Sequence, residues 1–405
     1  MPEYTKTDLE AENLPDDRKP LLPKKNSLGE IALVFSKLGV TAFGGPAAHI
    51  AQIELEVVQR RQWLSREKLL DLLSISNLIP GPNSTELVIH VGLERAGWRG
   101  MLVAGSCFIL PAMLMTWGLA IAYGQYQSIP TAGGLLYGIK PVIIAIVLQA
   151  LTKLGRSALK SAATWSAGIL VLVLYLLSIN EIILMLSAGL IVTLVANLQA
   201  LKKSRFLSFT ISPLAWGTFT LGAIATESHP KTWLAVFWSF LKIGSFLYGG
   251  GYVLLAFVQQ EFVDRLHWLT SQQLLDAVAI GQFTPGPILT TATFIGYLIA
   301  GNLGAIAATI GIFLPAFMLV PLINPFVSKL RKSPWTAGFL DGVNAASIGL
   351  MAAVAWELGR GTLTDIWTIV IAIASLAILL KFPKLNSVWL VLAGGAIGWL
   401  LKIYQ

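Results

Sequence analysis

The sequence of 405 residues has a single cysteine, Cys107, only four histidines and few charged residues. One cysteine excludes an intrachain disulfide and a cysteine-based metal site. The histidines are too scattered for a zinc motif, and neither an HExxH cluster nor a Walker A motif is present. Charged residues make up 12% of the chain, whereas soluble domains carry about 25%. This balance excludes a soluble enzyme, and no metal or cofactor is expected.

The residues that are abundant form long apolar blocks. Hydrophobic residues make up 55% of the chain and the mean hydropathy is +0.70. The blocks run for roughly 17–25 residues, which is the length of a helix that crosses a lipid bilayer. The net charge of +8 lies mostly in the short gaps between blocks, where basic residues stay on the cytoplasmic side. We therefore expect an all-α polytopic membrane protein with no nucleic-acid partner.

The first 26 residues form a different kind of segment. They are polar, contain proline and both signs of charge, and have no apolar core typical of a signal sequence. We expect residues 1–26 to be a disordered cytoplasmic tail.

The remaining sequence contains an internal duplication. Residues separated by 205 positions match in type, and after one deletion the separation becomes 204. The matched pairs are Phe35 with Phe240, Lys37 with Lys242, Glu56 with Glu261, Asp71 with Asp276, Pro80-Gly81-Pro82 with Pro285-Gly286-Pro287, Ala96-Gly97 with Ala300-Gly301, and Gly138 with Gly342. This order of rare residue types predicts two homologous repeats, residues 27–205 and 233–405.

The charges in the gaps predict how the repeats face the membrane. In the first repeat the basic gaps alternate with gaps that lack basic residues, and in the second repeat the alternation has the opposite phase. An extra apolar stretch within residues 206–232 has no counterpart and is expected to cross the membrane once. We therefore predict repeats of inverted topology in the plasma (inner) membrane, with a cytoplasmic N-terminus and an external C-terminus.

The first two segments of each repeat are interrupted. Gly44-Gly45-Pro46 and Pro80-Gly81-Pro82 break the first copy, and Gly249-Gly250-Gly251 and Pro285-Gly286-Pro287 break the second. Proline and paired glycines end helices, so each segment is expected to be two short helices joined by irregular backbone. Basic residues between the two segments and after them favour re-entrant hairpins that return to the cytoplasm, which gives nine spans and four hairpins: Arg60, Arg61, Arg66, Lys68, Arg95 and Arg99. The alternative is that each segment crosses fully, which gives thirteen spans.

Such breaks are candidate anion sites. A helix N-terminus presents unpaired amide groups and a partial positive charge. Polar side chains flank both breaks and are expected to bind the substrate together with the glycines and prolines: Asn83, Ser84 and Thr85 in the first copy, and Thr284 and Thr290 in the second. Ile288-Leu289 stands where the first copy has Asn83-Ser84, so the second site is expected to be weaker or purely structural.

Two lysines occupy equivalent positions before the breaks. Lys37 and Lys242 lie inside apolar runs, and an intramembrane charge usually faces a cavity. We predict that they attract an anion; the alternative is that each one extends to the membrane interface.

Three residues are candidates for proton coupling. His49 follows Pro46, but its counterpart is Leu254, and a lone histidine is more often structural. Glu56 and Glu261 match each other, although each also has an arginine at i+4 and could be an ion-pair partner.

Glu86, Lys140 and Asp341 lie in apolar surroundings without identical counterparts, and Lys140 is a secondary candidate for the anion path.

These motifs carry a family resemblance. The stretch FSKLGVTAFGGPAAH with its copy FLKIGSFLYGGG, and NLIPGPNSTEL with its copy QFTPGPILTTATFIGY, resemble the signature elements of the chromate ion transporter family in its long, two-domain form. The resemblance implies a secondary transporter that exports chromate, driven by the proton gradient or the membrane potential, and gives chromate resistance. It also implies sulfate as the natural competitor. An importer of sulfate or another oxyanion, and a membrane-embedded enzyme, are the alternatives. A monomer and a homodimer both remain open.

Overall fold

The protein is helical throughout the part of the chain that the structure describes. The computed structural model describes residues 27–42, 46–126, 130–203, 230–326, 330, 333–382 and 385–403. Within these ranges there is no strand, which confirms the predicted all-α class. The expected tail, Gly44 and Gly45, and residues 206–229 of the expected linking span lie outside the described residues.

The α-helices and the π-helix of the two copies follow in the same order, and the second copy has three additional short 3-10 helices among the described residues. The first copy consists of α1 (Leu28–Thr41), α2 (Pro46–Glu54), the π-helix η1 (Leu55–Arg60), α3 (Arg66–Ser76), α4 (Asn83–Tyr126), α5 (Pro130–Ala158), α6 (Ala162–Leu176) and α7 (Glu181–Lys203). The second copy consists of α8 (Trp233–Phe246), η3 (Gly251–Val253), α9 (Leu254–Val258), the π-helix η4 (Gln259–Arg265), α10 (Ser271–Phe283), η5 (Ile288–Thr290), α11 (Thr291–Ile323), η6 (Asn324–Phe326), α13 (Pro334–Thr362), α14 (Ile366–Lys381) and α15 (Ser387–Ile403).

The helices have the length and surface of membrane segments. Among the described residues, four helices are long and apolar enough to cross a bilayer: those within α4, α5, α11 and α13. The helices α6, α7, α14 and α15 expose large apolar side chains, among them Ile169, Leu190, Ile373 and Leu392. Exposed apolar surface of this extent is stable against lipid rather than water. The protein is therefore a multi-pass membrane protein.

Each interrupted segment of the first copy folds back on itself. Arg61, after η1, pairs with Glu30 at the start of α1 at 2.9 Å, and Lys68 of α3 pairs with Glu94 of α4 at the same distance. In the second copy, Lys231 before α8 donates to the carbonyl of Trp268 after η4 at 3.4 Å. Both ends of these segments therefore lie together, as the hairpin alternative requires and the full-crossing alternative does not.

The hairpin formed by α4 depends on glycine. The helix changes direction at Ala96-Gly97, where Gly97 has φ +60°, and α11 does the same at Ala300-Gly301, where Gly301 has φ +62°. Positive φ is accessible to glycine at little cost. Past the kink, a Cβ on Gly100 would meet the carbonyl of Gly92, so the two arms pack backbone to backbone.

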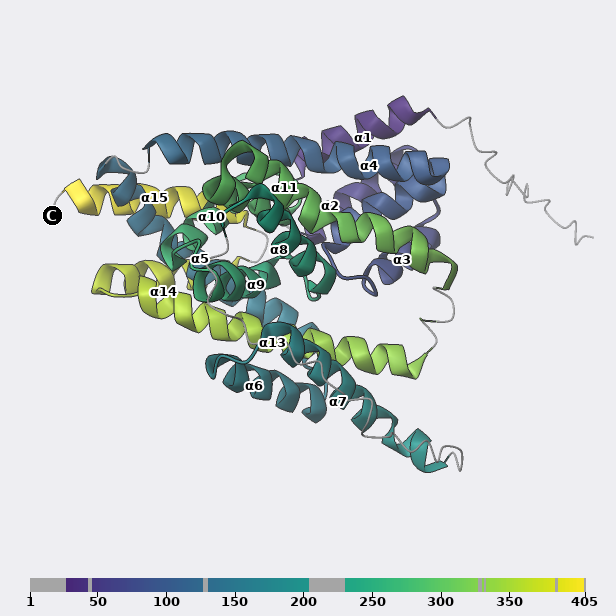
Figure 1. Cartoon of the computed structure of the whole chain (residues 1–405). Helices are drawn as coiled ribbons and strands as arrows, with labels where there is room; N and C mark the ends of the chain where they lie inside the picture. The colour runs from purple at the N-terminus through teal and green to yellow at the C-terminus, as the bar shows by residue number, and fades with distance from the viewer. Residues whose placement is uncertain are drawn as a thin grey trace, which may run out of the picture.

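The two copies interlock rather than forming separate bodies. The helix α13 of the second copy packs against α6 and α7 of the first, while α5 of the first copy packs against α14 and α15 of the second. Figure 1 shows α6 and α7 beside α13, apart from the short broken helices. The centre is formed where α4 packs against α11 and α5 against α13, and this arrangement brings the breaks of both copies together.

Candidate substrate site

The breaks of the two copies are joined by a reciprocal pair of hydrogen bonds. The amide of Gly81 donates to the carbonyl of Leu247 at 2.7 Å, and the amide of Gly286 donates to the carbonyl of Ala42 at 2.8 Å. Ala42 and Leu247 are equivalent positions of the repeat, as are Gly81 and Gly286. Each Pro-Gly-Pro loop therefore satisfies the backbone at the end of the broken helix of the other copy, so irregular backbone is paired inside the protein.

Only glycine fits at the centre of these loops. Gly81 has φ +140° and Gly286 has φ +83°, a region that side chains with a Cβ rarely adopt. A Cβ on Gly286 would lie 2.8 Å from the Cβ of Ala112 and 3.1 Å from the carbonyl oxygen of Gly39. Gly81 and Gly286 therefore allow both the close approach of the neighbouring backbone and the hydrogen bonds that join the two breaks.

His49 lies at the first break. Its Nε2 is 3.0 Å from the carbonyl oxygen of Ala42, and its Nδ1 is 3.3 Å from Oγ of Ser84. The ring therefore connects the end of α1 with the start of α4. In the second copy, Oγ of Ser347 donates to the carbonyl of Tyr248 at 2.9 Å, so a side chain from α13 holds the corresponding break.

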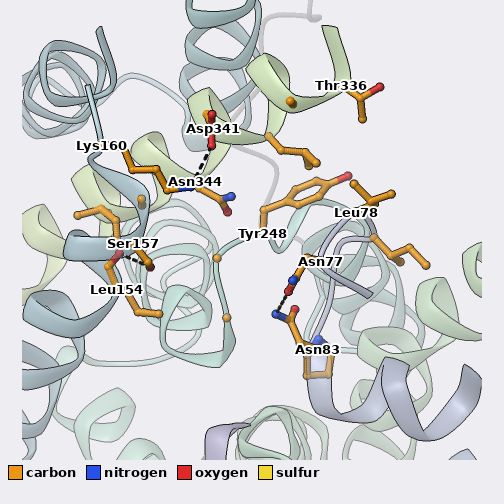
Figure 2. A pocket seen from close by; sticks show the side chains of 18 of the residues that line it. Asn77, Leu78, Asn83, Leu154, Ser157, Lys160, Tyr248, Thr336, Asp341 and Asn344 are labelled. Atoms are coloured by element: carbon orange, nitrogen blue, oxygen red, sulfur yellow. Dashed lines mark hydrogen bonds and ion pairs between the residues drawn. The ribbon is translucent and has the colours of Figure 1, made fainter. Parts of the chain in front are cut away.

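A cavity of about 570 Å³ opens beside these breaks. We call it the Asn83 cavity; its lining includes Asn77, Pro82, Asn83, Lys160, Tyr248, Gly249, Gly250, Gly251, Thr336, Asp341 and Asn344. Figure 2 shows Asn77 and Asn83 on one side of it, Lys160, Asp341 and Asn344 on the opposite side, and Tyr248 between them. Four predicted site residues, Pro82, Asn83, Gly249 and Gly250, are brought together there.

The Asn83 cavity offers hydrogen-bond donors and a cation. In the first turn of α4, the amides of Thr85 and Glu86 donate to the carbonyl of Pro82, whereas those of Asn83 and Ser84 have no acceptor among the described residues. Nδ2 of Asn83 donates to Oδ1 of Asn77 at 2.6 Å. Nζ of Lys160 lies 3.8 Å from Asp341 and its side chain is 65% exposed. Free amides at a helix start and an ammonium group across the same cavity are suited to an oxyanion.

The hydroxyl groups predicted to bind substrate do not line the Asn83 cavity. Ser84 bonds to His49, and Thr85 is fully buried. Thr290 and Thr284 donate to the carbonyls of Pro287 and Gly281. Pro80, Gly81 and the whole second Pro-Gly-Pro loop, Pro285, Gly286 and Pro287, are buried without lining the cavity. Substrate contact by these residues stays a prediction.

The two predicted lysines are engaged in ion pairs at the hairpin bases. Lys37 contacts Glu56 at 3.2 Å, and Arg60 contacts the same oxygen at 2.7 Å. Glu261 is paired with both Lys242 and Arg265. Glu56 also contacts Arg61 at 3.5 Å. Contact with two or more cations favours the ion-pair role for Glu56 and Glu261, and neither lysine lines the Asn83 cavity. Their roles in attraction and proton coupling stay predictions.

The cavity also contains residues that the motifs did not indicate: Asn77, Lys160, Tyr248 and Asn344. Asn344 stands 204 positions after Lys140, which was singled out as part of the anion path. The repeat therefore contained a signal for Asn344. Lys160 had no such signal, because its charge is also explained by its place in a basic gap.

A second cavity of about 430 Å³ is the repeat counterpart of the first. We call it the Lys140 cavity; it is lined by Tyr123, Gly133, Leu136, Tyr137, Lys140, Gln272, Asp276, Gly361, Thr362, Thr364, Thr368 and Lys402. Adding 204 to the numbers of Gly133, Leu136, Tyr137 and Lys140 gives Ala337, Leu340, Asp341 and Asn344, all of which line the Asn83 cavity. Equivalent faces of α5 and α13 therefore line the two cavities.

Lys140 and Asp276 form a buried ion pair in this second cavity. Their charged atoms are 3.3 Å apart, and their side chains are 7% and 2% exposed. The hydroxyl of Tyr123 donates to the other carboxylate oxygen of Asp276 at 2.7 Å. Ionisable groups inside membrane proteins usually mark a substrate or ion path. The described residues contain no cluster of three or more side chains suited to a metal ion.

Comparison with known proteins decides the family. The family model described as "Chromate transporter" matches the chain twice, over residues 29–193 and 234–399. The chain belongs to the chromate transporter family.

Its relatives match over almost their whole length. The chain is 31% identical over 376 residues to a chromate transport protein of Cupriavidus metallidurans, with 92% of each chain covered. It is 30% identical over 391 residues to one of Pseudomonas aeruginosa, with 94% of each covered, and 32% identical over 362 residues to a probable one of Synechococcus elongatus, with 88% of this chain and 91% of the relative covered. No solved structure matches the chain. Membership of the chromate transporter family makes the protein a membrane transporter rather than an enzyme.

Proposed function

We propose that this member of the chromate transporter family exports chromate from the cytoplasm across the plasma (inner) membrane, coupled to the proton gradient, and thereby gives chromate resistance. The observation that carries the proposal is the Asn83 cavity, which reaches the point where the breaks of both repeats are joined. Transporter substrate sites commonly lie where broken helices of two repeats meet.

The chemistry of the Asn83 cavity is matched to a doubly charged tetrahedral oxyanion. Chromate offers only acceptor oxygens and negative charge, so its site must supply donors. The free amides at the start of α4, the side-chain amides of Asn77 and Asn83, and the ammonium group of Lys160 are such donors. Among the described residues that line the cavity, Asp341 is the one carboxylate, and Lys160 compensates its charge. Sulfate has the same charge and shape and is proposed as a competitor.

The two cavities support an alternating-access cycle. Along α5, Lys140 lines one cavity and Ser157 and Ala158 line the other. These positions are about 25 Å apart along the helix axis. The gap after α5 contains Lys160, whereas the gap before it has no basic residue, so the Asn83 cavity is assigned to the cytoplasmic side. The Lys140 cavity is assigned to the outside, as inverted repeats would require. The N-terminus is then cytoplasmic and the C-terminus external.

Uptake of chromate into everted membrane vesicles tests this proposal. In everted vesicles the cytoplasmic face is outside, so an exporter accumulates chromate when the membrane is energised. We expect accumulation that an uncoupler abolishes and that excess sulfate reduces, compared with vesicles from cells that lack the protein. Accumulation only in right-side-out vesicles would support the oxyanion importer, and accumulation that survives the uncoupler would exclude proton coupling.

A further inference from the structure

The buried carboxyl group of Glu86 has no role in the proposed binding of chromate. Glu86, in the first turn of α4, has no solvent exposure, and neither of its oxygens has a hydrogen-bond partner among the described residues. Glu56 and Glu261, at the hairpin bases, are compensated by ion pairs, since Glu56 contacts three cations and Glu261 contacts two. Glu181, at the start of α7, is also buried with neither oxygen hydrogen-bonded among the described residues, but its charged neighbours are Lys242, Glu261 and Arg265. Glu86 has no such ion pair among the described side chains.

Glu86 lies directly against the joined breaks. A Cβ placed on Gly81 would collide with Oε1 of Glu86, so the carboxyl group packs on the glycine whose amide bonds to Leu247. The phenol of Tyr248, which lines the Asn83 cavity, is near enough to interact electrostatically with Glu86. Glu86 itself is not part of the cavity wall, so the group is adjacent to the substrate site but separate from it.

A line of titratable side chains leads from Glu86 to the hairpin base. His90 and Glu94 follow at intervals of four residues, which places all three on one face of the helix. His90 is fully buried, and neither ring nitrogen has a hydrogen-bond partner within the described part of the chain. Glu94 is 29% exposed and pairs with Lys68. The line therefore begins at the breaks and ends at the surface that bears Lys68.

The burial of Glu86 determines its charge in this state. An ionised carboxylate without a partner in a dry interior is very costly, so the group is neutral and carries a proton. We propose that Glu86 is the proton-binding group of the transport cycle, and that His90 and Glu94 pass its proton to the surface at Lys68. The transfer moves one proton from the Glu86 carboxyl to the His90 imidazole and then to the Glu94 carboxylate, with no other bond changed.

The titratable groups around Glu86, His90 and Glu94 are consistent with a single proton path. His49 is connected to Ser84, Tyr248 of the second copy is within electrostatic range of Glu86, and Lys68 of α3 pairs with Glu94 and is within electrostatic range of His90. The second copy has Thr291 at the position of Glu86 and Ile295 at that of His90. Thr291 donates to the carbonyl of Ile288, so the equivalent half-helix has no proton carrier at these positions.

This inference rests on the proton coupling of the proposed function, and two assays on purified protein in liposomes separate them. Exchange of labelled for unlabelled chromate needs no net proton movement, whereas concentrative uptake driven by a pH gradient does. We expect Glu86→Gln, which is permanently neutral, to retain exchange and to lose gradient-driven uptake to the level of protein-free liposomes. Glu67→Gln, at an exposed carboxylate of α3, is the matched control and should retain both activities.

A second variant covers the case in which Glu86→Gln does not fold. His90→Gln should retain exchange and slow the proton movement that accompanies chromate, measured with a pH-sensitive dye. Gradient-driven uptake by Glu86→Gln at the wild-type rate, or unchanged proton movement in His90→Gln, overturns the inference while the proposed function stands. A wild-type protein that transports chromate without proton movement overturns the inference and the coupling together.

Discussion

The amide of Gly81 donates a hydrogen bond of 2.7 Å to the carbonyl of Leu247, across the boundary between the two repeats. Its counterpart, from Gly286 to Ala42, is 2.8 Å long. Neither repeat therefore completes its own break, because each supplies the donor that the other needs. A change at one Pro-Gly-Pro loop is expected to affect both halves of the protein.

The first prediction concerns Gly286. Gly286→Ala places a side chain at φ +83° and within 3.1 Å of the carbonyl oxygen of Gly39, so we expect it to destabilise the protein by on the order of 1–3 kcal/mol and to abolish chromate transport. Thermal unfolding of the purified protein and vesicle uptake measure the two effects. Gly118→Ala is the control, because nothing lies within 4 Å of its added Cβ. If the two variants behaved alike, the joined breaks would not be essential.

The second prediction concerns Lys160. Lys160→Gln removes the cation at the Asn83 cavity, just after the end of α5, so we expect the KM for chromate on the cytoplasmic side to rise roughly three- to tenfold, more at low salt than at high salt. Lys153→Gln, at an exposed lysine of α5 outside the cavity, should have little effect. Equal KM values for the two variants would remove Lys160 from the site.

The third prediction separates two roles for Lys140 and Asp276. Lys140→Gln leaves Asp276 buried without its cation, which we expect to cost on the order of 3–5 kcal/mol in stability. Lys140→Gln combined with Asp276→Asn should recover most of this loss, because no unpaired charge remains. We expect the double variant to fold but to exchange labelled chromate poorly when the label is added on the external side. Normal exchange by the double variant would show that the pair is structural.

The fourth prediction compares Glu56 with Glu261. Lys242 and Arg265, which contact Glu261, are 33% and 32% exposed. Lys37 and Arg60, which make the shorter contacts with Glu56, are 52% and 56% exposed, and Arg61, at 3.5 Å, is 28% exposed. Water therefore screens the ion pairs of Glu261 less than the shorter ion pairs of Glu56, so Glu261→Gln is expected to lower stability by on the order of 1–3 kcal/mol and Glu56→Gln by less. Unfolding midpoints of the two purified variants provide the comparison, and a larger loss for Glu56→Gln would contradict it.

Much of the architecture follows from the repeat in the sequence. The matched breaks and the matched Ala-Gly kinks at Gly97 and Gly301 have nearly the same backbone geometry in both copies, because the same residue types impose the same constraints. The hairpin form of the broken segments was not decided by these residues alone. It depends on contacts such as Glu30 with Arg61, between side chains far apart in the sequence.

The composition of the site was less predictable. Asn83, Ser84 and Thr85 are consecutive, and the side chains of neighbouring residues on a helix point about 100° apart around the helix axis. Only Asn83 lines the cavity, while Ser84 turns to His49 and Thr85 is buried. Lys37 was expected near the break because of its spacing, but the returning helix places Glu56 and Arg60 beside it. Such partners depend on tertiary packing, which a motif does not encode.

Labelling of two equivalent residues from the two sides of the membrane tests the central claim most directly. In a background with Cys107→Ser, Leu340→Cys would place a thiol in the Asn83 cavity, and Leu136→Cys would place one at the matching position of the Lys140 cavity. A membrane-impermeant thiol reagent should label the first variant only from the cytoplasmic side, with protection by chromate, and the second only from outside. Labelling of both from the same side would contradict inverted repeats with oppositely opening cavities.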